Sequence, residues 1–384
     1  MINKVLTNIL LFLLSAPLFS QSLSDISFGT DSTFEAVTWN IEWFPKNGSL
    51  TVDSVSKIIE SLDVDLLGLQ EIDDTAMCRQ MVNNLPDYEL FMDNVWFGGL
   101  AYIYNTSTVS IQSIYKIYDT APYWNTFPRS PLVVELTFNG DELIVINNHF
   151  KCCGDGFLDI GNSADEEVRR YEASTLLKQY IDSNFNSSKV IVLGDLNDNI
   201  SDNQPNNVYQ MFLDDSTNYT FADMSIALGA SSEWSFPSWP SHLDHMLITN
   251  ELFTEFSSPN FEIKTIRVDD YLVGGFADYN LNISDHRPVG MKIQVIPTTL
   301  NLPEFSIADI KIFPNPTNGH VAVDLRQFTH ASKIKITTLT GKIVQTLNYQ
   351  DNELISFNFK EPAGIYLLSV ESGSNRSITK LMVH

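Results

Sequence analysis

Residues 190–198 read VIVLGDLND, an apolar run that ends abruptly in Asp195 and Asn197. The apolar part has the length and composition of a buried β-strand. Because side chains alternate along an extended chain, Asp195 and Asn197 point to the same side of it. A strand that runs into an ordinary turn explains the stretch equally well, since Asp and Asn favour turns. The residues at the other strand ends of the chain are the evidence that distinguishes a turn from a site.

The start of the chain predicts export. Lys4 precedes an apolar run from Ile9 to Phe19 that is too short to span a bilayer but is typical of a signal peptide, which we place at residues 1–20. No later stretch has the length and hydropathy of a transmembrane helix. We therefore expect a secreted or cell-surface protein that is exported through the periplasm, has no transmembrane anchor and is a monomer.

Length limits the number of domains, and charge limits the partners that the chain can attract. With 384 residues, 43% of them apolar, the chain is long enough for two or three domains. Residues 307–384 hold 8 Lys/Arg and 6 Asp/Glu, which leaves 15 and 41, a net charge of −26, for residues 1–306. So acidic a region has no general attraction for nucleic acid or anionic lipid. Action on phosphates then requires a bound metal and local cations.

Cysteine usage suggests one disulfide. The chain has three cysteines, Cys78, Cys152 and Cys153, and a disulfide is allowed in an exported protein. Because adjacent cysteines rarely bond each other, we expect Cys78 to pair with either Cys152 or Cys153.

Residues 34–295 alternate strand and helix patterns, which predicts an α/β domain with two packed sheets. Apolar residues recur at helical spacing in residues 54–62, and Ser163 with Glu166 forms a capping-box pattern that opens a helix to about Ile181. Strands are expected at residues 34–44, 65–71, 101–105, 132–138, 143–150, 190–197, 245–249, 262–268 and 288–295.

The pattern changes after a Pro- and Thr-containing linker, IPTTLNLPE at residues 296–304. Beyond it, short alternating strands are separated by turn residues every 8–12 positions, which is typical of a small all-β sandwich. This tail contains no catalytic constellation.

Several strand candidates of the α/β domain end in a polar residue, as residues 190–198 do. One such end is a turn, but six, drawn from carboxylate, amide and imidazole, indicate a site at one rim of a sheet. The polar residues are Asn40, Glu71, His149, Asp195 with Asn197, Asp244, and Asp285 with His286.

In this order the segments resemble the endonuclease/exonuclease/phosphatase superfamily. The matching pieces are WN at 39–40, LQE at 69–71, PRSP at 128–131, NNHFK at 147–151, GDLN at 194–197, LDH at 243–245 and SDHRPV at 284–289. The resemblance implies a four-layer α/β/β/α sandwich similar to pancreatic-type deoxyribonuclease. We expect the catalytic domain at residues 21–296, a linker at 297–306 and the tail domain at 307–384.

The resemblance also implies roles for the polar residues. Phosphodiester hydrolysis requires a hard cation, and Mg²⁺ prefers carboxylate, amide oxygen and water ligands. Glu71 is the expected main ligand of Mg²⁺, with Mn²⁺ or Ca²⁺ as alternatives, and Asn40 and Asp285 line the same pocket.

The remaining residues are expected to act on the phosphate and the water. Asp195 would position or deprotonate the attacking water, Asn197 would hold a phosphoryl oxygen, and His149 would donate to the phosphate or the leaving oxygen. His286 would be the general base or a charge stabiliser, with Asp244 fixing its tautomer.

Structural alternatives exist for several of these side chains and their neighbours. Asn40 could simply cap a strand end, and Asp244 is expected to be buried in either case. Of His242 and His245, which flank Asp244, we expect one at the surface and one packed in the core. Arg169 and Arg170 are expected on a solvated helix face.

The substrate is less closely defined. NNHFKCCGDG and the helix after it are most similar to extracellular nucleases of the superfamily, so we predict a secreted nuclease acting on DNA or RNA. A phospholipase C or sphingomyelinase-like phosphodiesterase is the alternative, and an inactive surface-binding domain is disfavoured because every chemical position is filled. One departure is WFGG at residues 96–99, where related secreted nucleases carry an acid that supports His149, so the orienting partner of His149 is unidentified.

The tail has a resemblance of its own. FPNPTNG at 313–319, LTGK at 339–342, GIYLLSV at 364–370 and TKLMVH at 379–384 resemble the C-terminal sorting domain of the type IX secretion system of Bacteroidetes. The resemblance implies that residues 307–384 interact with that secretion machinery. An immunoglobulin-like module that binds carbohydrate is the alternative.

Overall fold

The computed structural model describes residues 22–92, 98–295, 310–326, 328, 332–350, 353–372 and 375–384. The predicted signal peptide and linker therefore lie outside the described residues. The chain divides into two compact units, residues 1–297 and 298–384, each of which is described by itself.

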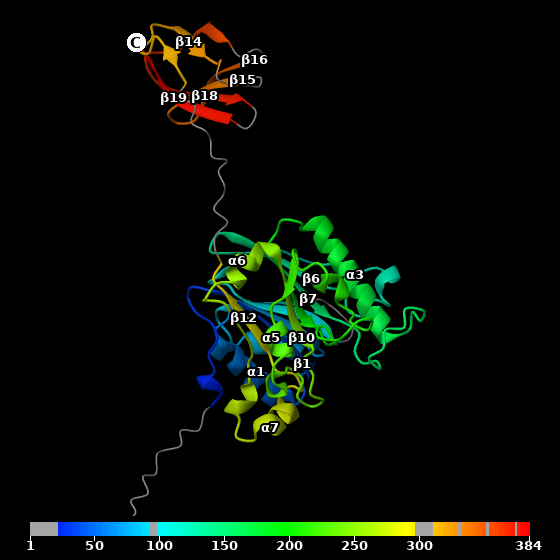
Figure 1. Cartoon of the computed structure of the whole chain (residues 1–384). Coiled ribbons are helices and arrows are strands. Elements are labelled where there is room, and N and C mark those ends of the chain that lie inside the picture. The colour runs from blue at the N-terminus through cyan, green and yellow to red at the C-terminus, as the bar shows by residue number, and fades with distance from the viewer. Residues whose placement is uncertain are drawn as a thin grey trace, which may run out of the picture. The chain divides into compact units, whose positions relative to one another are not determined.

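The larger unit contains two six-stranded mixed sheets (Figure 1). In the first sheet the strands β1 and β2 run parallel at the centre, and the other neighbours are antiparallel. Its order is β11 (Glu262–Thr265), β12 (Val289–Ile293), β1 (Phe34–Phe44), β2 (Leu66–Ile72), β4 (Gly99–Asn105) and β3 (Tyr88–Met92).

The second sheet has the same design, with β7 and β8 as its central parallel pair. Its order is β5 (Val109–Lys116), β6 (Leu132–Phe138), β7 (Asp141–His149), β8 (Val190–Asp195), β10 (Asp244–Thr249) and β9 (Tyr219–Phe221). The apolar run that ends at Asp195 is thus a fully buried central strand.

The helices cover the outer faces of the two sheets. Figure 1 shows α3 (Glu166–Asn184) on one side of the strands and α1 (Gly48–Leu62) and α7 (Gly275–Asn282) on the other. The further α-helices are α2 (Thr75–Val82), α4 (Gln210–Leu213), α5 (Met224–Ala227) and α6 (Phe253–Phe256). Short 3-10 helices are η1 (Leu23–Asp25), η2 (Ala121–Tyr123), η3 (Ser231–Glu233), η4 (Asn250–Leu252) and η5 (Val268–Tyr271).

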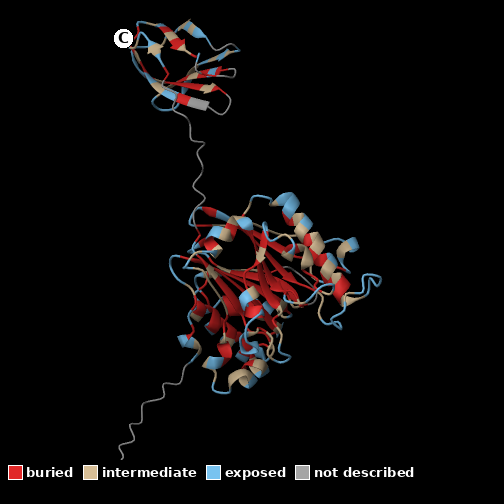
Figure 2. Ribbon diagram, viewed as in Figure 1, coloured by how far each residue is buried: buried red, intermediate tan, exposed pale blue. Residues whose placement is uncertain are grey.

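Three separate hydrophobic clusters hold these four layers together. Side chains alternate along β1, so Phe34 and Ala36 pack between the sheets while Val37 and Trp39 pack beneath α1. A third cluster joins the outer face of the second sheet to α3. Figure 2 shows the buried residues concentrated in the strands and in the inner faces of the helices. The predicted α/β/β/α sandwich is confirmed.

The start of α3 differs from the sequence expectation. The N-cap is Asp165, whose carboxylate accepts the backbone N–H of Val168 at 2.8 Å, and the helix runs from Glu166 to Asn184. The predicted capping box of Ser163 and Glu166 is therefore wrong. Asp is as good an N-cap as Ser, and sequence spacing alone does not choose between two candidates two residues apart.

The smaller unit is the predicted all-β sandwich. One sheet has the order β13 (Ile312–Phe313), β14 (His320–Asp324) and β17 (Leu354–Asn358), and the other β16 (Ile343–Tyr349), β15 (Ser332–Thr338), β18 (Gly364–Ser372) and β19 (Asn375–Val383). Its own hydrophobic cluster joins Val321 and Val323 of one sheet to Ile334, Ile336 and Leu368 of the other.

The predicted disulfide is wrong, because all three cysteines are free. Cys78 is fully buried in the hydrophobic cluster beneath α1 and α2, whereas Cys152 and Cys153 line a pocket at the rim of the sheets. The sulfur atoms of Cys152 and Cys153 lie 2.9 Å apart. Cys78 follows Glu71 by only seven residues but does not lie at the site, since α2 turns its thiol into the core.

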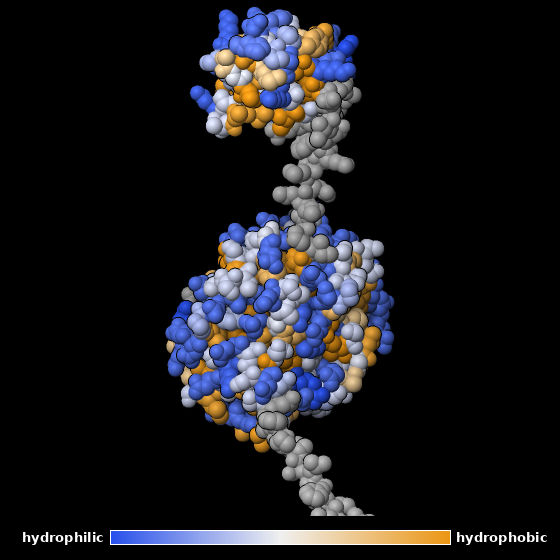
Figure 3. All heavy atoms as spheres, turned by 90° about the vertical axis from the view of Figure 1, so that its left-hand side faces the viewer, coloured by the Kyte–Doolittle hydropathy of each residue, from blue (hydrophilic) through white to orange (hydrophobic). Residues whose placement is uncertain are grey.

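The exposed surface is largely hydrophilic (Figure 3), as the many charged residues of the chain predict. On the larger unit, hydrophilic side chains dominate the face shown in Figure 3, and apolar ones are scattered among them. Within the ranges that the structure describes, no helix is both long and apolar enough to cross a bilayer.

Candidate active site

Three neighbouring strands of the second sheet bring His149, Asp195 and Asp244 side by side. In the strand register His149 of β7 lies opposite Asp195 of β8, and Asp195 lies opposite Asp244 of β10. All three side chains are nearly or fully buried. The polar strand ends noted in the sequence therefore meet at one rim, and the turn after Asp195 is secondary to this arrangement.

The first sheet contributes Asn40 and Glu71 at the same rim. The Asn40 amide Nδ2 donates to Glu71 Oε1 at 3.1 Å and to Asp195 Oδ2 at 2.9 Å, so it ties the two sheets together. Its Oδ1 accepts the backbone N–H of Glu42 at 2.9 Å. Asn40 is thus more than a strand cap: it holds two carboxylates in place, and ligation of a cation by its oxygen stays a proposal.

His286 reaches the rim from the segment between α7 and β12. Its Nδ1–H donates to Asp244 Oδ2 at 2.7 Å. The backbone is anchored as well, since Ser284 Oγ donates to the Asn40 carbonyl at 2.7 Å and Tyr279 donates to the His286 carbonyl at 2.6 Å. The ring also packs against Phe236, with 4.7 Å between the ring centroids.

These groups surround a cavity of about 540 Å³, a size suited to a small ligand or one nucleotide. Six of the eight predicted site residues line it: Glu71, His149, Asp195, Asn197, Asp285 and His286. Asn40 and Asp244 lie behind the wall and contact those that do.

Burial and neighbouring charges shift the pKa values of His286, Asp195 and Asp285. Burial by itself lowers the pKa of His286, but Asp244 and Asp195 outweigh burial and raise that pKa to about 10. Burial raises the pKa of Asp195 to about 7, against the opposing effect of His286. Burial and the carboxylate of Glu42 raise the pKa of Asp285 to about 6. His286 is therefore protonated at neutral pH, while Asp195 is poised to exchange a proton.

Comparison with protein families matches residues 37–286 to the endonuclease/exonuclease/phosphatase family. The match covers more than half of the chain. The chain belongs to the endonuclease/exonuclease/phosphatase family. Residues 311–384 match a second family, the secretion system C-terminal sorting domain, which indicates export by the type IX route to the cell surface or beyond.

Solved structures of this family share the fold. The chain is 15% identical to TDP2 of D. rerio in a complex with a single-stranded DNA product, with a TM-score of 0.52, and 69% of this chain and 100% of that one are covered. It is also 15% identical to an endonuclease/exonuclease/phosphatase of Bacteroides vulgatus, with a TM-score of 0.50 and coverage of 69% and 100%. A comparison with curated proteins found no match.

The donor set of this family member fits a divalent cation. Among the described residues no Lys or Arg lies within ion-pair distance of Glu71, whose oxygens instead accept from the Asn40 amide and the Trp43 backbone N–H. Glu42, which also pairs with Lys46, and Asp285 add two further carboxylates to the same cavity. Carboxylate oxygens are the ligands that Mg²⁺ and Mn²⁺ prefer.

His149 is held in the neutral form. Burial, and then the charges of Arg129 and His286, lower the pKa of His149 well below its usual value. Its Nε2 lies 3.6 Å from Asp195 and 3.8 Å from Glu71. Its Nδ1 is buried and has no partner among the described residues, so the orienting group that the sequence failed to identify is missing here too.

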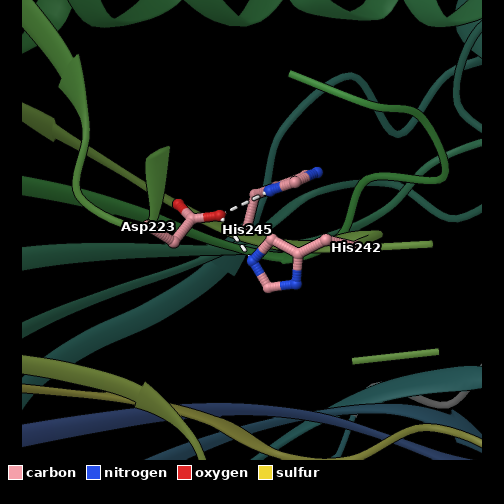
Figure 4. A group of neighbouring side chains, drawn as sticks. All are labelled: Asp223, His242 and His245. Atoms are coloured by element: carbon pink, nitrogen blue, oxygen red, sulfur yellow. Dashed lines mark hydrogen bonds and ion pairs between the residues drawn. The ribbon is translucent and has the colours of Figure 1, made fainter. Parts of the chain in front are cut away.

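A second buried cluster supports the site from behind (Figure 4). Asp223 Oδ2 accepts from His242 Nε2 at 3.0 Å and from His245 Nδ1 at 2.6 Å, and His245 Nε2 donates to the Asp198 carbonyl at 2.8 Å. Burial by itself lowers the pKa of His245, but Asp223 outweighs it and raises that pKa. Both histidines are buried, so the expectation that one lies at the surface is wrong. The cluster pins the loop after Asp195.

Arg170 also differs from its expectation. It is 2% exposed, and its Nε donates to Asp198 Oδ2 at 2.8 Å. It therefore belongs to the wall of the site and not to a solvated helix face. Helical spacing gave no signal for this, because Asp198 and the Lys151 and Cys153 carbonyls, which accept from its guanidinium, lie in loops.

Sequence reasoning missed several pocket residues, above all Glu42, Trp43 and Trp239. Glu42 and Trp43 have positive φ values of 36° and 48°, as do Glu71 at 64° and Asn197 at 58°. Of the eight described non-glycine residues with positive φ, these four and Cys153 line the cavity. Such strained backbone is concentrated at functional sites. Glu42, Trp43 and Glu71 lie in the bulge where β1 and β2 lose register after Asn40, and no residue pattern announced that bulge.

Proposed function

We propose that this protein is a secreted, metal-dependent nuclease that hydrolyses phosphodiester bonds of DNA or RNA by in-line attack of water on phosphorus. The observation that carries the proposal is the convergence of Glu71, Asp195, His149 and protonated His286 in one cavity. Two carboxylates, a neutral imidazole and a charged imidazole are the groups that this reaction needs.

Glu71, together with Asp285 and Glu42, would hold the cation, which we propose to be Mg²⁺, with Mn²⁺ or Ca²⁺ as alternatives. When bound, such a cation neutralises charge on the phosphoryl oxygens. Asn40 supports this site by fixing the orientation of Glu71, with which it shares a 3.1 Å hydrogen bond, and its amide oxygen would be a further ligand of the cation.

Asp195 would accept the proton of the attacking water. Its pKa of about 7 lets it do so near neutral pH. Asn197 follows two residues later, with its backbone N–H bonded to Asp195 Oδ1 at 3.1 Å, and would donate its amide to a phosphoryl oxygen.

The two histidines would meet the developing negative charge. His286 carries a positive charge that Asp244 stabilises, which favours charge stabilisation over the role of general base. His149 is neutral, and its Nε2–H would donate to the phosphate or the leaving oxygen.

Exposed aromatic rings favour a nucleic acid over a lipid headgroup. Trp43 is 42% exposed and Trp239 is 80% exposed, and both line the cavity. Bases of single-stranded nucleic acid stack on such rings irrespective of sequence, and stacking needs no positive surface. Base stacking is therefore compatible with the strongly acidic charge of this unit.

The proposal extends to export and organisation. Residues 1–20 would be a signal peptide, residues 21–296 the catalytic domain and residues 297–306 a linker. Residues 307–384 would engage the type IX secretion machinery after the chain has crossed the periplasm. The mature protein would act as a monomer.

The test is to incubate the purified protein with plasmid DNA, RNA and sphingomyelin, each with and without EDTA. We expect cleavage of nucleic acid that EDTA abolishes and that Asp195→Asn and His286→Ala reduce by about 10²–10⁴-fold. Cleavage of sphingomyelin alone would show that the protein is a lipid phosphodiesterase and not a nuclease. Near-native cleavage by both variants would refute the assigned site.

A further inference from the structure

A second group of carboxylates gathers where the loop after β7 meets the start of α3. Asp155 lies in this loop, Asp165 caps the helix and Glu167 is in its first turn. One carboxylate oxygen from each of the three lies within 4.8 Å of the others. None of these residues belongs to the catalytic group described above.

Glu167 supplies the observation that points to a missing ligand. Its side chain is 2% exposed, and its Oε1 accepts the Gly156 N–H at 2.7 Å and pairs with Arg170 at 3.2 Å. Its Oε2 is buried and has no hydrogen-bond partner among the described residues. A buried carboxylate oxygen without a partner is costly, so a bound group is expected to satisfy it.

The loop is built onto that carboxylate. Gly154 has φ +109°, and a Cβ at this position would fall 2.2 Å from Glu167 Oε1. Asp165 and Asp155 each use Oδ1 to accept a backbone N–H, from Val168 at 2.8 Å and Phe157 at 3.0 Å. No hydrogen bond to the second oxygen of either aspartate is present in the described part of the chain, which leaves these oxygens available for a cation.

Nearby positive charge does not balance the three carboxylates. Arg170 divides its guanidinium between Glu167 and Asp198, with 2.8 Å from its Nε to Asp198 Oδ2. Lys151 pairs with Glu166, at 3.8 Å, outside the cluster. The cluster therefore keeps an excess of negative charge.

We infer that Asp155, Asp165 and Glu167 bind a calcium ion that braces the wall of the active-site cavity. The donors are all oxygens, and the exposed position of Asp155 leaves room for water ligands. Ca²⁺ accepts six to eight oxygens in irregular geometry, whereas Mg²⁺ demands a near-ideal octahedron. Gly154, Gly156 and Glu167 all line the cavity, so the ion orders a surface that the substrate touches.

The test measures calcium binding without any substrate, so its outcome is independent of the proposed nuclease activity. The mature full-length chain carries Glu71→Gln to weaken the catalytic cation site, is stripped with EDTA, and is titrated with CaCl₂ or MgCl₂ alone. Isothermal titration calorimetry gives the affinity, and amide hydrogen exchange of residues 152–165 reports the order of the loop.

The variants separate charge from structure. Asp155→Asn and Asp165→Asn remove one charge each, and an asparagine at the N-cap position would still cap α3. Asp159→Asn, an exposed acid of the same loop outside the cluster, is the matched control.

We expect one calcium ion to bind and to slow exchange in the loop. Asp155→Asn and Asp165→Asn should weaken calcium binding by about tenfold or more and abolish the protection, and Asp159→Asn should do neither. Equal calcium affinity in all four proteins would overturn the site. Equal protection by Mg²⁺ at the same concentration would overturn its assignment to calcium.

Discussion

His286 donates its Nδ1–H to Asp244 Oδ2 at 2.7 Å, and Asp244 is fully buried. The two residues are 42 positions apart, and the bond joins the segment before β12 in the first sheet to β10 in the second. It keeps His286 protonated and its ring directed at Asp195, with 3.8 Å between Nε2 and Oδ2. The charge state of the site thus depends on a contact between the sheets.

Asp244→Asn tests this contact. The substitution keeps the shape but removes the charge that raises the pKa of His286, so we expect kcat for phosphodiester cleavage to fall by about 10²–10⁴-fold with little change in KM. Circular dichroism should show an unchanged fold. NMR titration of the His286 ring should show a lowered pKa. A native rate together with a native pKa would mean that Asp244 is only structural.

Glu71→Gln tests the cation site. Loss of one carboxylate charge should raise the Mg²⁺ concentration needed for half-maximal activity, by about tenfold or more. The measurement is cleavage rate against Mg²⁺ concentration after treatment with EDTA. Asp53→Asn, an exposed acid on α1 that does not line the cavity, should leave the curve unchanged. If both variants gave the wild-type curve, Glu71 would not be the principal ligand.

Trp239→Ala tests base stacking. Stacking of one base is worth about 1–3 kcal/mol, so KM for a single-stranded oligonucleotide should rise by about 5–150-fold. The rate with bis(p-nitrophenyl) phosphate, which has no base, should stay the same. Trp124→Ala is the matched control, since Trp124 is 62% exposed but does not line the cavity. An equal loss with both substrates would argue for a structural role of Trp239.

Glu35→Gln tests a buried carboxyl in β1. Burial raises the pKa of Glu35 from 4.5 to about 8. Between these values the unfolded chain releases a proton that the folded protein retains, so wild-type stability is lost as the pH rises toward 8. The variant has no such loss, and its urea midpoint should rise relative to wild type between about pH 5 and about pH 8. Glu142→Gln, at an exposed position, should follow wild type. A difference that stays constant with pH would contradict the raised pKa.

Deletion of residues 307–384 tests the sorting role. Among the residues that the structure describes, none beyond Val295 belongs to the hydrophobic clusters of the larger unit, so the truncated protein should fold and remain active. It should accumulate in the periplasm instead of the medium. Cell fractionation with an activity assay on each fraction measures this, and full-length protein is the control. Normal release of the truncated protein would exclude sorting by the tail.

Much of the fold was predictable from local pattern. The apolar, β-branched and aromatic residues at 34–44 and 132–138 specified strands, and most of these residues are buried in the structure. The polar ends of these and similar strands marked Glu71, His149, Asp195 and His286, and the cavity brings them together. The change of pattern after residue 296 likewise predicted the all-β tail.

Tertiary structure alone decided the features that depend on partners distant in the sequence. Cys78 is buried because α2 packs on the first sheet, and His242 and His245 are buried because Asp223 lies between them. The bulge after Asn40 turned Trp43 into the cavity, and the fold of the loop before α3 set Glu167 against Gly154. Periodicity is a property of adjacent residues, whereas charge state, exposure and ligation are set by whichever side chains the folded sheets bring within a few ångströms.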